Sequence, residues 1–190
     1  NFAKAIDVIE PYLRAQPGDG QALMLLANAH MASGRNAKAA ALIEQALKAQ
    51  DNPALRTTLG LSLVGDGQTA NGIVELEAAY RKDPRQTHAA IALIQLYLQT
   101  GQSVKAVPIA DKLVKAQPGN AQRQNLLGMA LAQSGNITAG RAALEKAASL
   151  DAELLQARLN LARLDIAGKS YDSAATRLDA LIKAAPKYPE

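Results

Sequence analysis

The sequence predicts an all-α fold, a solenoid of antiparallel helix pairs, and three observations lead to this prediction. Glycines able to end a helix recur at Gly34, Gly67, Gly101, Gly135 and Gly168, at intervals of 33, 34, 34 and 33 residues. Proline or aspartate keeps nearly the same interval at Pro17, Asp51, Pro84, Pro118, Asp151 and Pro186. Between these markers, apolar residues stand three or four apart, as on the buried face of a helix. A period of this length indicates repeats that stack on their neighbours.

Composition restricts the kind of core that this chain can form. Its 190 residues are 48% apolar and 20% charged, which is ordinary for a globular protein. Aromatic residues make up only 3% and tryptophan is absent, so the core must be built from alanine and leucine. Such a core suits closely spaced helices. The absence of cysteine excludes disulfides and thiol catalysis, and it leaves the compartment open.

The charge pattern argues against two kinds of partner. The net charge of +4 comes from 21 basic and 17 acidic residues that are scattered along the chain. Because no basic run with interleaved aromatic residues is present, we expect no nucleic-acid site. No apolar run approaches the ~20 residues of a membrane-spanning helix, so we expect no membrane span in this segment.

The markers divide the chain into half a repeat, five whole repeats and a tail. Residues after the turn glycines, Asn36, Thr69, Ser103 and Ser170, are of types that cap helix starts. Because the chain begins with half a repeat and lacks polar terminal caps, we expect one solenoid domain excised from a longer protein, with uncovered ends able to associate end to end. The predicted ranges are 1–19 (second helix of a truncated repeat), 20–52, 53–86, 87–120, 121–154 and 155–186 (repeats 1 to 5), and 187–190 (tail).

Large and small residues occupy fixed places in these repeats. In the first helices a large residue precedes a small one at Leu26–Ala27, Leu59–Gly60, Leu127–Gly128 and Leu161–Ala162. In the second helices a small residue recurs at Ala5, Ala39, Gly72, Ala106, Gly140 and Ala174. This pattern resembles the tetratricopeptide repeat over essentially the whole chain. The resemblance implies a right-handed superhelical solenoid, with small residues where helices touch and a concave surface lined by the first helices.

The chain departs from the family at the position where an aromatic residue is preferred three residues after the small one. Only Tyr97 matches there, while His30 and Asp165 occupy this place in other repeats, and the family tryptophan is absent. We expect His30 to be a packed or half-buried ring. With two histidines, no cysteine, no marked pair of general acids and bases and no phosphate-binding glycine loop, we expect no enzyme, no catalytic residue, no metal site and no cofactor.

The resemblance directs attention to exposed positions on the concave side of the first helices. Methionine and leucine among glutamine and asparagine suit an extended segment or an amphipathic helix, whereas a carboxylate clamp would need more Lys and Arg. The alternative is that these residues only solubilise one face of a scaffold. The predicted groove residues are Gln21, Met24, Asn28, Met31, Thr57, Leu61, Val64, His88, Ile91, Gln95, Leu98, Gln122, Asn125, Met129, Gln133, Gln156, Leu159, Asn160 and Arg163.

The leading functional hypothesis is a non-catalytic scaffold that binds another protein or a peptide. Phrases such as LLANAHMASGR and LLGMALAQSGN resemble long repeat proteins of bacterial envelopes, namely lipoproteins of the PEP-CTERM sorting system and scaffolds of exopolysaccharide export. That resemblance implies a periplasmic or outer-membrane location. The alternative is a cytosolic adaptor that captures a peptide or helix from a chaperone or regulatory partner. Direct polysaccharide binding would require exposed aromatic platforms, which the predicted groove lacks.

Overall fold

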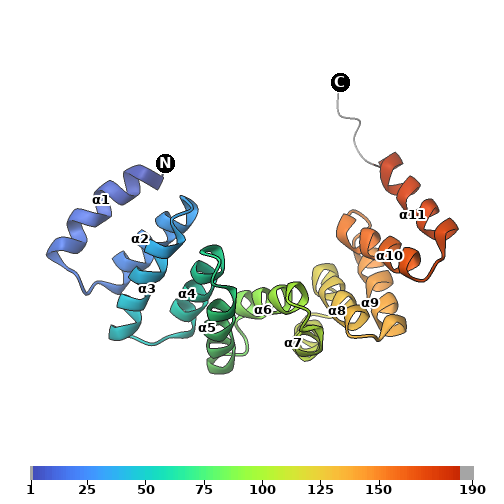
Figure 1. Cartoon of the computed structure of the whole chain (residues 1–190), viewed down its shortest axis with the longest axis horizontal. Coiled ribbons are helices and arrows are strands. Elements are labelled where there is room, and N and C mark those ends of the chain that lie inside the picture. Colours follow the sequence, from blue (N-terminus) through green and yellow to red (C-terminus); the bar gives the residue numbers. More distant parts are fainter. Residues whose placement is uncertain (1, 185–190) are drawn as a thin grey trace, which may run out of the picture. The chain divides into compact units, whose positions relative to one another are not determined.

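The computed structural model describes residues 2–184, which form eleven α-helices and contain no strand (Figure 1). Pro186 and the predicted tail 187–190 lie outside the described residues. Within the described part of the chain, no helix has both the length and the apolar character needed to cross a membrane. The helices are α1 (Phe2–Ala15), α2 (Gly20–Ala32), α3 (Asn36–Ala49), α4 (Pro53–Gly65), α5 (Thr69–Lys82), α6 (Thr87–Gln99), α7 (Ser103–Ala116), α8 (Ala121–Gln133), α9 (Ile137–Leu150), α10 (Leu155–Ala167) and α11 (Tyr171–Ala184).

The helices form two compact units, with the boundary inside α6 after Leu96. In unit 1, α1 packs on α2, α2 on α3, α3 on α4 and α4 on α5. In unit 2 the same succession runs from α7 to α11. The first helices of successive pairs also touch, α2 with α4 and α8 with α10. Packing restricted to near neighbours is the arrangement of a solenoid, and each predicted repeat range holds one helix pair.

Glycine allows the sharp reversal between the paired helices. Gly34, Gly67, Gly101 and Gly135 have φ angles between 73° and 95°, in the left-handed region. At the second turn, Gln68 N donates to Leu63 O at 2.8 Å, which satisfies a terminal carbonyl of α4. The prediction for Gly168 is wrong, because its φ is −83° and Lys169 takes the left-handed conformation instead (φ 60°). Gly168 occupies the C-cap position of α10, one residue before the place of the earlier glycines.

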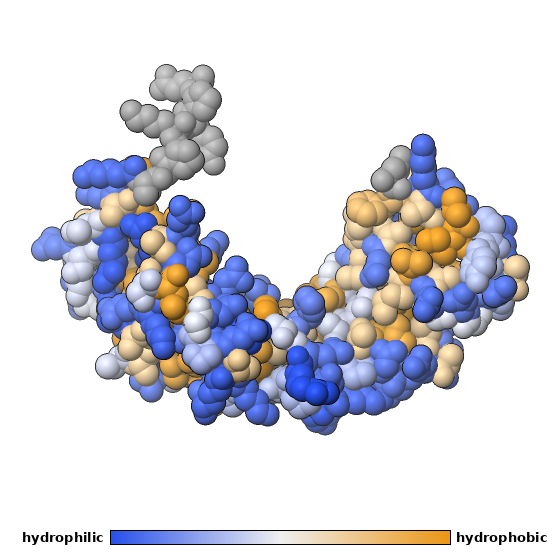
Figure 2. Space-filling view, turned by 180° about the vertical axis from the view of Figure 1, so that it is seen from behind, coloured by the Kyte–Doolittle hydropathy of each residue, from blue (hydrophilic) through white to orange (hydrophobic). Residues whose placement is uncertain are grey.

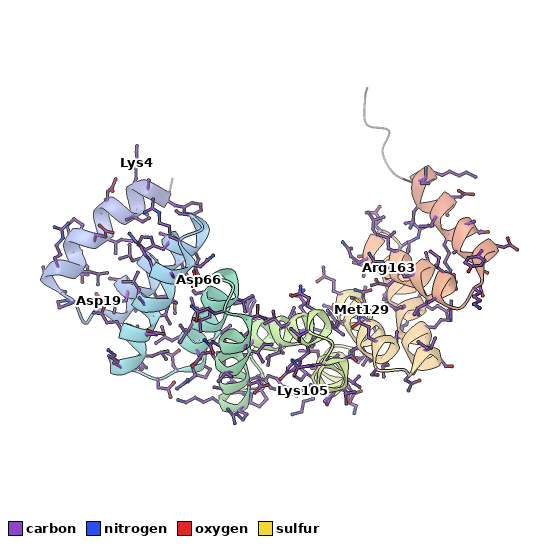
Figure 3. The ribbon with its side chains drawn as sticks, in the orientation of Figure 1. Lys4, Asp19, Asp66, Lys105, Met129 and Arg163 are labelled. Atoms are coloured by element: carbon purple, nitrogen blue, oxygen red, sulfur yellow. The ribbon has the colours of Figure 1, made fainter. Side chains whose placement is uncertain are left out.

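Three of the first helices begin at a side chain that caps them. Asp19 Oδ1 accepts hydrogen bonds from Gln21 N (2.9 Å) and Ala22 N (3.0 Å) at the start of α2, where Figure 3 labels it. Asn52 caps α4 and Asn120 caps α8 in the same way. These bonds satisfy amides that the helix itself leaves unpaired.

The predicted caps of the second helices are placed differently. Asn36, Thr69 and Ser103 are the first residues of α3, α5 and α7, and the residue before each makes no side-chain cap, so this prediction is wrong. A single residue connects each turn glycine to the helix that follows. The residue two positions after the glycine is therefore already helical and cannot precede the helix as its cap. Ser170 does stand directly before α11.

Small residues bring the two helices of a pair into contact, as the family resemblance implies. A Cβ at Gly128 would lie 2.6 Å from Leu144 Cγ and 2.9 Å from Gly140 O. A Cβ at Gly60 would likewise lie 2.9 Å from the carbonyl oxygen of Gly72. The α4–α5 and α8–α9 pairs therefore pack backbone to backbone. Alanine, leucine and isoleucine dominate the buried residues, as the composition predicts.

Candidate partner-binding surface

The first helices of each unit form a continuous surface that carries most of the predicted groove residues. We call the surface of α2 and α4 the first-helix face of unit 1, and that of α8 and α10 the first-helix face of unit 2. The remaining four predicted residues lie on α6, the helix that contains the boundary between the units. His88 and Gln95 are exposed, whereas Ile91 and Leu98 are half-buried.

The first-helix face of unit 1 carries both polar and apolar side chains. Gln21, Asn28 and Leu61 are exposed, and Met24, Met31 and Val64 are half-buried. Thr57 is buried at 7% exposure, so the prediction that it is exposed is wrong. Its hydroxyl lies 2.8 Å from Pro53 O and 2.9 Å from Gln86 Oε1. Thr57 therefore anchors the segment before α6 instead of facing solvent.

A pocket of about 790 Å³ opens beside this face, between the start of α2, the end of α3 and the start of α4. Gln21 and Met24 line it together with Leu25, whose side chain is 59% exposed. A large exposed leucine beside a polarisable methionine offers an apolar contact for a partner's side chain. Leu25 is not among the predicted groove residues, although it is an apolar residue directly after Met24.

On the first-helix face of unit 2, Gln122, Gln133, Gln156, Leu159 and Arg163 are exposed, and Met129 is half-buried. Figure 3 shows Met129 on α8 and Arg163 on the neighbouring α10. The five exposed positions have the exposure that the phase of the repeats predicts, whereas Met129 is more buried than predicted. Their use by a partner stays a prediction.

Two predicted groove residues of unit 2 are buried instead of exposed. Asn125 and Asn160 are each 8% exposed, and Asn160 Nδ2 donates to Asn125 Oδ1 at 2.9 Å. Arg163 Nη1 donates in turn to Asn160 Oδ1 at 3.2 Å, and Asn125 Nδ2 lies 3.8 Å from Met129 Sδ. Burial is tolerated because each amide has polar partners, one of them the other amide. The resulting chain of contacts holds Arg163 and Met129 in place at the surface.

The two first-helix faces are nearly neutral. Among α2, α4, α8 and α10, all within the described residues, Arg163 is the single exposed charged side chain. Arg56 pairs with Asp51 (2.6 Å) and Glu75 (2.7 Å). Arg123 and Arg158 are half-buried and donate to the backbone carbonyls of Leu113 and Ala152. Arg163 is therefore the most accessible charge on these faces.

Unit 2 contains a cluster of charged side chains around Asp165 that was not predicted from the sequence. Asp165 is 2% exposed and pairs with Arg141 of α9 at 2.6 Å and with Arg177 of α11 at 2.8 Å. Burial alone would raise the pKa of Asp165, but hydrogen bonds from the two arginines outweigh it and lower the pKa below its usual 3.8. An aspartate in the place of a family aromatic was a signal that a compensating partner was needed. The cluster joins three helices and is structural.

Comparison with known proteins is consistent with this geometry. A family model described as "Tetratricopeptide repeat" matches residues 1–60, 63–130 and 131–190. The chain belongs to the tetratricopeptide repeat family. Members of the family carry the helix pairs described above as their repeating element.

This tetratricopeptide repeat protein is similar in sequence to a curated protein and in fold to solved structures. It is 29% identical over 170 residues to cellulose synthase operon protein C of Pseudomonas fluorescens (strain SBW25), covering 83% of the chain but 13% of that protein. The structure of MamA (residues 41 to the end) from Desulfovibrio magneticus RS-1 is similar with a TM-score of 0.79 at 19% identity, covering 87% of this chain and 95% of that one. YrrB, a TPR protein with an unusual peptide-binding site, has a TM-score of 0.71 at 20% identity, covering 82% and 81%. Both structural likenesses concern the fold.

Proposed function

We propose that this tetratricopeptide repeat protein is a non-catalytic scaffold that binds a segment of a partner protein on its first-helix faces. The observation that carries the proposal is the combination, on the same faces, of adaptable apolar side chains with fixed polar ones. Met24 and Leu25 border an open pocket in unit 1. In unit 2, Met129 and Arg163 are the two ends of the chain of contacts through Asn125 and Asn160.

The chemistry of these faces favours a partner segment with apolar anchors and few charges. The apolar anchors would contact Leu25 and Leu159, which are exposed although apolar. Backbone or side-chain carbonyls of the segment would accept from the amides of Gln122 and Gln156 and from Arg163. An extended peptide or one face of an amphipathic helix meets this description.

The proposed setting is a bacterial envelope assembly linked to exopolysaccharide export. Support comes from the likeness to cellulose synthase operon protein C, which extends over 83% of this chain. The short phrases rich in Ala, Gln, Leu and Gly point to the same setting. In this proposal the first-helix faces hold another component of the assembly, and the chain performs no reaction itself.

Site-specific photocrosslinking in the native host tests the proposed faces. A photoreactive residue would replace Leu25 in unit 1 or Gln156 in unit 2, both exposed on first helices. Matched controls carry the same residue at Glu44 of α3 and Glu145 of α9, both exposed on second helices. We expect one discrete crosslinked partner from the first-helix positions, identified by mass spectrometry of the crosslinked peptide.

A charge introduced on the first-helix face of unit 2 should weaken binding of the partner. Met129→Glu places a charge on the face of unit 2 at a half-buried position and should reduce the crosslink from Gln156. Equal crosslinking from the second-helix controls would show that partners use another surface. A partner found in the cytosol would overturn the envelope setting and favour the adaptor alternative.

A further inference from the structure

Unit 1 contains a second pocket, away from the first-helix face, that the proposed function does not use. It has a volume of about 550 Å³ and lies between α1, α2 and α3, lined at its base by Leu13, Leu23, Leu26 and Leu42. Apolar side chains gather on the surface of these N-terminal helices in the space-filling view (Figure 2). Gln45 Nε2 donates to Pro17 O at 2.7 Å, so α3 is tied to the end of α1 beside the pocket. The volume is in the range of small-molecule sites.

A buried histidine lines this pocket. His30 is 2% exposed, and its Nδ1 is the one buried side-chain nitrogen or oxygen among residues 2–184 without a hydrogen-bond partner. A buried polar atom left unpaired is costly, and such atoms are rare in folded proteins. His30 itself lines the pocket, so an N–H of its ring is the polar group that the pocket offers beside the leucines.

The same chain shows how the equivalent position is satisfied elsewhere. Asp165 stands 135 positions after His30, four repeats on, and its carboxylate pairs with Arg141 and Arg177. The residues 135 positions before these arginines are Ile6 and Leu42. His30 is therefore a buried polar side chain with apolar residues at both of the positions where the equivalent Asp165 has its partners.

The rim of the pocket carries an excess of positive charge. Arg14 and Lys38 line it and are exposed, and neither makes an ion pair among the described residues. Glu10 is the single acidic residue that lines it. Burial first, and then the charges of Arg35 and Lys38, lower the pKa of His30, against an opposing effect of Glu10. The imidazole is thus held in its neutral form, with one N–H to donate.

From this arrangement we infer that the pocket between α1, α2 and α3 binds a small carboxylic acid with an apolar chain. The chain packs against Leu13, Leu23 and Leu42. The carboxylate accepts the N–H of His30 and is attracted by Arg14 and Lys38. This inference does not depend on the proposed partner-binding faces, because none of the predicted groove residues lines the pocket.

Histidine-selective ¹⁵N NMR with octanoate as the probe tests the inference on the whole chain. The chain has two histidines, so exposed His88 is an internal control in each spectrum. We expect octanoate, kept below its micellar range, to shift the His30 resonances in a saturable way and leave those of His88 unchanged. Acetate lacks the apolar chain and 1-octanol lacks the negative charge, so each should bind at least about tenfold more weakly than octanoate. Shifts at neither histidine, or at both equally, would overturn the site.

Variants that remove one positive charge beside the pocket test whether octanoate binds there and not on an apolar surface elsewhere. Arg14→Gln and Lys38→Gln should each weaken octanoate binding by about threefold, the effect of losing one exposed ion pair. Lys48→Gln, an exposed lysine of α3 that does not line the pocket, is the matched control and should bind as the parent does. Leu42→Arg, which restores the residue type found at 177, should fill the pocket and abolish the His30 shift. Octanol binding as tightly as octanoate, or unaltered affinity in both rim variants, would refute the assignment to an acid.

Discussion

Asn160 Nδ2 donates a hydrogen bond of 2.9 Å to Asn125 Oδ1, and this bond joins α10 to α8 between successive repeats. The two side chains are buried, so neither amide has ready access to water in exchange. The bond therefore contributes both to the stability of unit 2 and to the placement of Arg163, which donates to the same Asn160 side chain.

We predict that Asn160→Ala destabilises the protein by about 1–3 kcal/mol, because it leaves Asn125 Oδ1 buried without a donor. Urea denaturation followed by circular dichroism measures the change. Gln156→Ala on the same helix is the control, since an exposed side chain should change the free energy of unfolding by less than about 0.5 kcal/mol. Equal losses in both variants would show that the amide pair has no special role.

A second prediction concerns the contact between α8 and α9. Gly128→Ala places a methyl group 2.6 Å from Leu144 Cγ and 2.9 Å from Gly140 O, and a backbone oxygen cannot rotate away. Forcing the helices apart should lower the free energy of unfolding by about 1–3 kcal/mol. Thermal unfolding monitored by circular dichroism measures this.

Gly119→Ala supplies the matched comparison within unit 2. A Cβ at Gly119 would meet no atom within 4 Å, and Gly119 is not in the left-handed region. Its replacement should be neutral or stabilise by up to about 1 kcal/mol through the unfolded chain. A melting temperature lowered as much as that of Gly128→Ala would mean that loss of glycine itself, and not the helix contact, explains the first result.

These features differ in how far the sequence alone reveals them. The helix pairs follow from local periodicity in neighbouring residues, and the close contact at Gly128 follows from the family resemblance. The burial of Asn125 and Asn160 does not, because each alone is a polar residue on the expected outer side of its helix. Only their mutual hydrogen bond, between residues 35 positions apart, makes burial favourable. The exposure of Gln156 and Arg163 follows from the helical phase alone, since both stand on the outer side of α10.

The left-handed residue of the turn at Gly168 could not be predicted from the sequence for a different reason. The regular spacing of the glycines predicted a left-handed residue at 168, whereas the constant length of the first helices determines its place in the structure. All five first helices have the same length, so the left-handed residue falls at 169, where lysine stands. Helix length is set by packing against neighbouring repeats, which the local sequence does not report.

A third prediction follows from the unpaired Nδ1 of His30. Leucine stands at the equivalent positions Leu63 and Leu131, so His30→Leu should fit and should remove a buried unsatisfied atom. We expect the free energy of unfolding to rise by about 1–2 kcal/mol at neutral pH. His88→Gln, at an exposed histidine, is the control and should leave it unchanged.

The advantage of His30→Leu should also depend on pH. Because the pKa of His30 is lowered from 6.5 in the folded protein, the unfolded chain takes up a proton first as the pH falls below 6.5. The parent protein therefore loses stability from about pH 6.5 downward, until the folded imidazole also titrates, and His30→Leu lacks this loss. A constant difference between the two proteins from pH 8 to pH 5 would contradict the lowered pKa.

The last prediction concerns Asp165, whose carboxylate pairs with Arg141 and Arg177. Asp165→Asn leaves the two guanidinium groups without a counter-charge beside a buried side chain. Loss of one partner from a buried pair costs about 3–5 kcal/mol, and we expect the lower end because both arginines are partly exposed. Urea denaturation at neutral pH measures the loss. Asp179→Asn, an exposed aspartate of α11, is the control and should change stability by less than about 0.5 kcal/mol.

Acidification distinguishes the ion pairs from simple packing of Asp165. Its pKa in the folded protein is lowered below the ordinary 3.8, so the ion pairs contribute fully above that pH. As the pH falls through the folded pKa, the carboxylate becomes protonated and the contribution disappears. The stability difference between the parent and Asp165→Asn should therefore be constant from pH 7 to about pH 5 and shrink below pH 3.8. A difference that persists undiminished in acid would mean that shape and hydrogen bonding, and not charge, make aspartate necessary between α9 and α11.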